Sequence, residues 1–185
     1  MDKARQYGFA AVALQFDYRD HEGRTTAGKW PEFESTLRAA GMSPGVWFTD
    51  GWMLPFAPPS ADFVCAEIES DLDYDGVVAS LNQLNDGQQH AVITTFVGLH
   101  VRKADGSLDV EATKKRCKPL IDAGFYCQIE AYDYTQPDNT EAAHCGWPSE
   151  MVAPVLGVGF NGRTLEQQKA LQVPGYGIYL AEYLP

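Results

Sequence analysis

Residues 62–69, with the sequence DFVCAEIE, form an apolar run that ends in the carboxylates Glu67 and Glu69. Three other stretches have the same form: 9–17 (FAAVALQFD), 45–50 (GVWFTD) and 125–133 (FYCQIEAYD). Each is rich in β-branched or aromatic residues, as a buried strand should be. Parallel barrels gather the carboxyl ends of their strands on one face, and that face carries the active site. We therefore expect Asp17, Glu67 or Glu69, and Glu130 to converge at one end of a parallel barrel.

Strand-like and helix-like segments alternate along the chain. Further strands are predicted at 90–97, 155–160 and 176–183, and helices at 31–40, 74–84, 110–123 and 164–171. Strict alternation implies parallel strands with right-handed crossovers. A complete eightfold barrel typically needs about 250 residues, whereas this chain has 185. The sequence predicts an α/β fold, a small TIM-like (β/α) barrel with about seven parallel strands, either with reduced helices or lacking one strand–helix unit. Residues 1–185 are expected to form one domain.

The charge and the cysteines restrict the classes of partner. The net charge is −11, from 25 acidic and 14 basic residues, so nucleic-acid binding is not expected. The apolar runs are too short for membrane insertion. The N-terminus lacks the apolar core of a signal peptide, which predicts synthesis in a host cytoplasm. The four cysteines show no paired short spacing and are predicted to be reduced and mostly buried, with no metal and no cofactor.

The segment Glu67-Ile68-Glu69 is the sharpest candidate for catalysis. Residues i and i+2 of a strand share a face, so both carboxylates would line the barrel lumen near its mouth. Like charges this close raise one of the two pKa values, and one acid can then stay protonated near neutrality. One residue would be a general acid and the other a base or an electrostatic stabiliser in glycoside hydrolysis. The alternative is that they pair with arginine or lysine, or that only one points inward.

Glu130 and Asp17 are the next catalytic candidates. Gln128, Glu130 and Tyr132 alternate onto one face of their predicted strand, as polar residues at the top of a barrel lumen would. Gln15 and Asp17 form the same kind of polar pair at the end of another strand. The alternative for Glu130 is a salt-bridged acid on the outer face.

Asp50 and four aromatic residues are the candidate substrate-binding groups. The aromatic residues lie in or after predicted strand ends: Trp47, Trp52, Tyr132 and Trp147. Sugars present flat apolar faces, which aromatic rings beside hydroxyl and acid groups suit. Asp50 can instead cap the turn into Gly51, and aromatic residues near proline also pack long loops.

The segment Ala66-Glu67-Ile68-Glu69 resembles the Asp-x-Glu strand end of the family 25 glycoside hydrolases, the lysozyme-like muramidases with a compact (β/α) barrel. The resemblance implies that Glu69 is the general acid and that Glu67 stands in place of the family's Asp. Asp17 would correspond to an early-strand Asp, although the surrounding Asp-Val-Ser pattern is absent. The segment 175–184 (GYGIYLAEYL) looks like the ends of barrel domains in minor tail proteins of actinobacterial phages. This resemblance implies a virion tail component that meets the host envelope.

The sequence therefore predicts a phage tail module that binds host cell-wall polysaccharide and, if active, hydrolyses it. The alternatives are a free-standing glycosidase or muramidase and a purely structural virion component with a degenerate active site. Location in the virion and contacts with other tail proteins follow from the resemblance. An oligomeric state within the assembly is expected because a seven-strand barrel leaves an open seam or a strained closure, and an unpaired strand edge invites a partner.

Overall fold

The computed structural model describes residues 9–16, 26–68, 70–80, 90–95, 99–130, 140–156 and 177–178. The chain divides into two compact units: Met1–Ile68 with Leu72–Val92, and Glu69–Asp71 with Ile93–Pro185. Strand β4 (His90–Thr95) spans the boundary between these units along the sequence. The predicted single domain over 1–185 stays a prediction.

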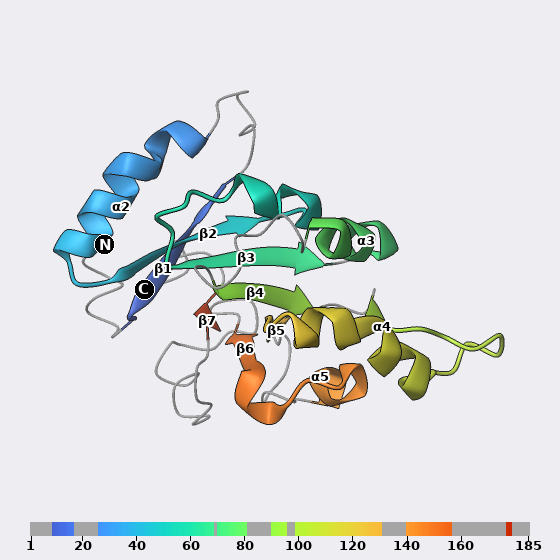
Figure 1. Cartoon of the computed structure of the whole chain (residues 1–185). Helices are drawn as coiled ribbons and strands as arrows, with labels where there is room; N and C mark the ends of the chain where they lie inside the picture. The colour runs from blue at the N-terminus through green and yellow to red at the C-terminus, as the bar shows by residue number, and fades with distance from the viewer. Residues whose placement is uncertain are drawn as a thin grey trace. The chain divides into compact units, whose positions relative to one another are not determined.

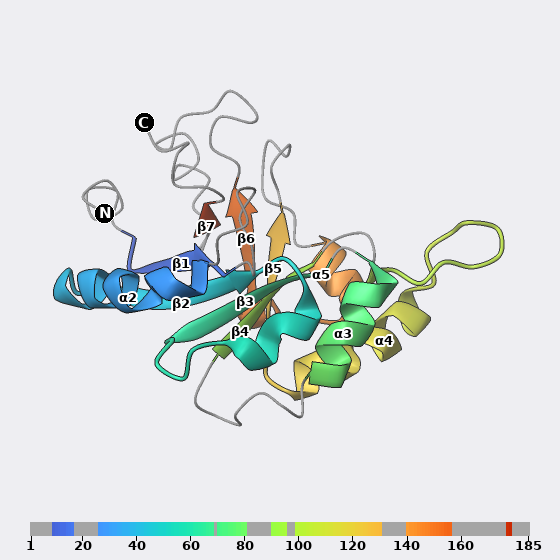
Figure 2. The same cartoon turned by 90° about the horizontal axis from the view of Figure 1, so that it is seen from above.

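In the described part of the first unit, β1, β2 and β3 lie side by side as parallel strands (Figures 1 and 2). Its elements are β1 (Ala11–Gln15), η1 (Thr26–Lys29), α2 (Trp30–Ala39), β2 (Ser43–Phe48), η2 (Gly51–Phe56), β3 (Phe63–Ile68) and α3 (Asp71–Ser80). The register places Leu14 opposite Val46 and Val46 opposite Val64. Paired residues of parallel strands share a face, so these three side chains form one apolar row.

Helix α2 covers this apolar face. Trp30 and Leu37 are buried and lie seven positions apart, on one side of the helix. The Trp30 ring meets Phe16 edge-on at 6.4 Å between ring centroids, and Phe16 meets Phe48 at 5.7 Å. The helix has a proline in its first turn, and Gly41 follows its end with φ of +72°, a conformation that favours glycine.

The second unit contains a second set of parallel strands, in which β6 pairs with both β5 and β7. Its elements include α4 (Val110–Asp122), β5 (Tyr126–Glu130), α5 (Thr140–Cys145), η5 (Ser149–Met151), β6 (Val152–Leu156) and β7 (Gly177–Ile178). Asp109 caps α4, since its carboxylate accepts the Ala112 N–H at 3.0 Å. Among its described residues, the buried apolar set is Leu99, Cys117, Leu120, Phe125, Cys127, Cys145 and Trp147.

The predicted seven-stranded TIM-like barrel is wrong, because the sheet is open. Closure into a barrel would give every strand two neighbours. Within the described part of the chain, β2 pairs with both β1 and β3, whereas β1 pairs with β2 alone and is therefore an edge strand. Ala11 and Gln15 at the ends of β1 are exposed, as at a sheet edge. The β/α alternation predicts the direction of the strands, but closure depends on strand tilt and stagger, which no local pattern reports.

The predicted helices agree with the structure in part. Helices α2 and α4 begin and end within one residue of the predicted 31–40 and 110–123. The helix predicted at 74–84 begins three residues earlier, as α3. Helix α5 lies between the predicted strands at 125–133 and 155–160, where the sequence predicted no helix. The helix predicted at 164–171 lies outside the described residues.

Candidate functional site

The parallel strands of the first unit bring several predicted site residues to one edge. Gln15 lies opposite Trp47, and Trp47 lies opposite Cys65, so the three share the face turned away from α2. Glu67 follows Cys65 by two positions and joins this face. We call Gln15, Trp47, Asp50 and Glu67 the carboxyl edge, because they lie in the last residues of β1, β2 and β3 or just beyond them.

The two acids of the carboxyl edge come from neighbouring strands. Asp50 follows β2 with an extended backbone and precedes η2. Its carboxylate does not cap η2, whereas its carbonyl oxygen accepts the Met53 N–H at 3.1 Å. Glu67 is half-buried, between the fully buried Ala66 and Ile68 that face the core. Because β2 and β3 are adjacent and parallel, the two carboxylates belong to the same end of the sheet.

Helix η2 presents two aromatic rings beside these acids. The side chains of Trp52 and Phe56 are 52% and 50% exposed, and their rings meet edge-on with centroids 6.0 Å apart. Met53 and Leu54 are buried and anchor η2 in the first unit. Both rings are thus held by a fixed backbone while their surfaces stay accessible.

Helix α3 packs closely against η2. A Cβ atom added to Gly76 would lie 3.2 Å from the Trp52 backbone nitrogen and 3.3 Å from the Trp52 Cβ. Such distances are tighter than ordinary van der Waals contact, so a larger residue at position 76 would require η2 to shift by a few tenths of an ångström. Gly76 therefore positions the backbone that carries Trp52.

Cys65 is excluded as a nucleophile at this edge. Burial raises the pKa of the Cys65 thiol to about 12. Since the thiolate is the reactive species, the side chain stays protonated and inert at neutral pH.

The other predicted site residues lie in the second unit or outside the described residues. Asp17, Glu69 and Tyr132 lie outside the described residues. Glu130 is the last residue of β5, in the second unit, and the placement of its side chain is not described. Trp147 is buried in the second unit, where its indole N–H donates to the Phe125 carbonyl at 2.8 Å. Because Phe125 precedes β5, this contact lies at the opposite end of that strand from Glu130.

The choice of site residues from the sequence omitted Gly76 and did not pair Phe56 with Trp52. The i, i+4 spacing of Trp52 and Phe56 is a helical signal, and it could have paired the two rings. No sequence signal marks Gly76, because its role depends on packing between α3 and η2.

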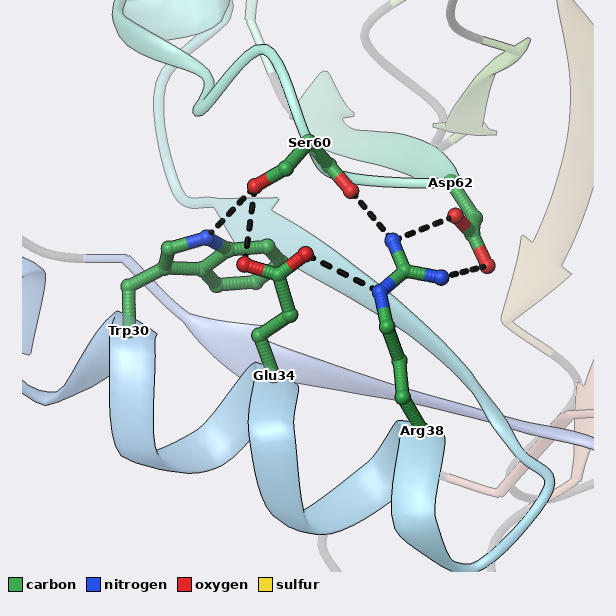
Figure 3. Close-up of polar contacts among 5 residues, drawn as sticks. All are labelled: Trp30, Glu34, Arg38, Ser60 and Asp62. Carbon is green, nitrogen blue, oxygen red and sulfur yellow. Dashed lines mark hydrogen bonds and ion pairs between the residues drawn. The ribbon is translucent and has the colours of Figure 1, made fainter.

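A dense polar cluster lies before the amino end of β3 and has a structural role (Figure 3). Arg38 donates to Glu34 at 3.0 Å, to Asp62 at 2.9 Å and to the Ser60 carbonyl at 2.6 Å. The Ser60 hydroxyl accepts the Trp30 indole N–H and donates to Glu34 at 2.9 Å. Hydrogen bonds from Arg38, and then from Ser60, lower the pKa of Glu34, which makes it a weak base for activating the Ser60 hydroxyl.

Within the described residues, no three His, Cys, Asp or Glu side chains are grouped as metal ligands would be. The helices in that part of the chain include none with the length and apolarity needed to cross a membrane. No protein-family model matches the chain, and no curated protein sequence matches it.

Proposed function

We propose that this chain is a carbohydrate-binding module that holds a cell-wall glycan at the carboxyl edge of β1–β3. The observation that carries this proposal is the exposed pair Trp52 and Phe56 beside the acid Asp50. The flat apolar face of a sugar ring packs on an aromatic ring, and its hydroxyl groups need hydrogen-bond acceptors. The carboxylates of Asp50 and Glu67 supply such acceptors.

The charge at this edge favours one class of glycan. Two carboxylates would repel a polymer rich in phosphate or carboxylate groups. A hydroxyl-rich stretch without negative charge avoids that repulsion and uses both acids as acceptors. The proposed ligand is therefore an uncharged stretch of a cell-wall polysaccharide.

The proposed setting is a phage tail, in which the module meets the host envelope as part of an oligomeric assembly with other tail proteins. The support is the likeness of residues 175–184 to the ends of minor tail proteins. Hydrolysis of the bound glycan is a second candidate function, favoured by the two carboxylates at neighbouring strand ends.

Binding to purified cell-wall glycan tests the proposal. Trp52→Ala and Phe56→Ala should each weaken binding about tenfold, which corresponds to about 1.4 kcal/mol. The control is Tyr126→Ala, because Tyr126 is an aromatic residue that is 40% exposed and belongs to β5 rather than to η2. An equal loss of glycan affinity in all three variants, or no binding of the glycan by the wild type, would overturn the proposal.

The same samples decide between binding and turnover. If the wild type releases reducing ends from the glycan, and Glu69→Gln lowers this release while binding is retained, hydrolysis would be added to the function. Binding without any release would leave a binding module alone.

A further inference from the structure

Two buried cysteines face each other between helices of the second unit. Cys117 lies in α4 and Cys145 is the last residue of α5. Both side chains are fully buried, and both carry free thiols. They are 28 positions apart in the sequence, so only the packing of α5 on α4 brings them together.

The contact of Gly146 with α4 places Cys145 opposite Cys117. A Cβ atom on Gly146 would lie 3.2 Å from Lys114 Cγ and 3.8 Å from Ile121 Cδ1. Lys114, Cys117 and Ile121 follow the spacing i, i+3, i+7 and share one face of the helix. The residue after Cys145 therefore touches α4 on both sides of Cys117.

The segment after Cys145 holds this arrangement in place. Gly146 has φ of +89°, which turns the chain sharply at the end of α5. Trp147 then anchors the chain through its hydrogen bond to the Phe125 carbonyl. A bond between the two sulfur atoms would join elements that are already packed, so it would need little movement of the backbone.

The electrostatic setting of Cys117 differs from that of Cys65. A hydrogen bond with the Cys145 side chain lowers the pKa of Cys117, and the charge of Arg116 adds to this against the opposing effect of burial. Burial alone raises the pKa of Cys65. Of these two thiols, Cys117 forms the thiolate more readily and is the better attacking group.

We propose that Cys117 and Cys145 form a reversible disulfide that locks α5 onto α4 when the protein meets a small-molecule disulfide. The Cys117 thiolate attacks one sulfur of the reagent, which breaks the reagent's S–S bond and releases one thiolate. Cys145, after losing its proton to solvent, attacks the sulfur of Cys117 and expels the second thiolate. Two protein thiols are oxidised, and the reagent is reduced to two thiols. This inference is independent of the proposed function.

Oxidised glutathione, added to the native full-length chain, tests this inference. After acid quenching, the intact mass should be lower than that of the unoxidised chain by two hydrogen atoms. Alkylation in denaturant, which exposes all of the buried cysteines, should then modify only two of them. Non-reducing peptide mapping should link Cys117 to Cys145 and leave Cys65 and Cys127 alkylated. The melting temperature should rise on oxidation and return to its starting value with dithiothreitol.

Matched variants sharpen the result. Cys117→Ser and Cys145→Ser should each abolish the link, whereas Cys65→Ser should leave it unchanged. Four alkylated cysteines after oxidation of the wild type, or a link that involves Cys65 or Cys127, would overturn the proposal. The wild-type peptide map decides the question even if a serine variant fails to fold.

Discussion

Gly45 and Phe63 are a pair of residues on which the close fit of β2 and β3 depends. They lie opposite each other in the parallel register. A Cβ atom on Gly45 would lie 2.4 Å from Cζ of the Phe63 ring, far inside van der Waals contact. The ring therefore packs directly over the glycine, on the same face as Trp47 and Cys65.

Gly45→Ala should destabilise the protein by about 1–3 kcal/mol, the usual range for overpacking. Without a clash, alanine in a strand is more stable than glycine by about 0.5–1 kcal/mol. A decrease in the free energy of unfolding would therefore identify the clash with the Phe63 ring. Urea unfolding measures the change. The control is Gly28→Ala, since nothing lies within 4 Å of the added atom there.

A double-mutant cycle with Phe63→Ala separates the clash from other effects of the substitution. Removing the ring should make Gly45→Ala less costly than it is in the wild-type background. Strictly additive changes would mean that the ring is not the cause.

At the scale of elements, the polar cluster of Figure 3 ties α2 to the segment that leads into β3. The planar guanidinium of Arg38 reaches Glu34 on its own helix and both oxygens of Asp62 across the gap. Ser60 links the indole of Trp30 to the same carboxylate of Glu34. Lysine could not reproduce this fork, because it presents a single ammonium group.

Glu34→Gln should lower the melting temperature at pH 7, and the difference from the wild type should shrink as the pH falls. The hydrogen bond from Arg38 holds the pKa of Glu34 below its ordinary value of 4.5 in the folded protein. A carboxylate whose pKa is lower in the folded protein than in the unfolded protein stabilises the fold at pH values above its unfolded-state pKa. This stabilisation is lost as the pH falls through its folded-state pKa. Melting curves between neutral and acidic pH check this.

The control for this pH series is Glu32→Gln, which changes an exposed carboxylate in the first turn of the same helix. The difference in melting temperature between this variant and the wild type should not shrink in the same way as the pH falls. A difference in melting temperature between Glu34→Gln and the wild type that stays constant over this pH range would contradict the role assigned to the ion pair of Glu34 with Arg38.

At the scale of the whole molecule, the charge balance makes a prediction about solubility. The net charge of −11 keeps molecules apart at neutral pH, and this repulsion vanishes near the isoelectric point of about 4.6. Light scattering measured across the acidic range should therefore peak near that pH. A peak at neutral pH instead would show that association is driven by an apolar surface rather than by loss of charge.

Features encoded in neighbouring residues could be predicted from the sequence alone. The alternation of apolar runs with helical segments predicted parallel strands, which the pairings of β1–β2, β2–β3, β5–β6 and β6–β7 confirm. Gly41 follows the end of α2 and Asp109 caps the start of α4, and such features are local because capping depends on a few adjacent groups.

Features that depend on distant segments were decided only by the tertiary structure. Whether the sheet closes depends on how strands far apart in sequence tilt against one another, so the barrel prediction failed. Trp52 and Trp147 both looked like loop aromatics, yet packing exposes one and buries the other. The pairing of Cys117 with Cys145 depends likewise on the docking of α5 on α4, since no local sequence pattern specifies which helices will meet.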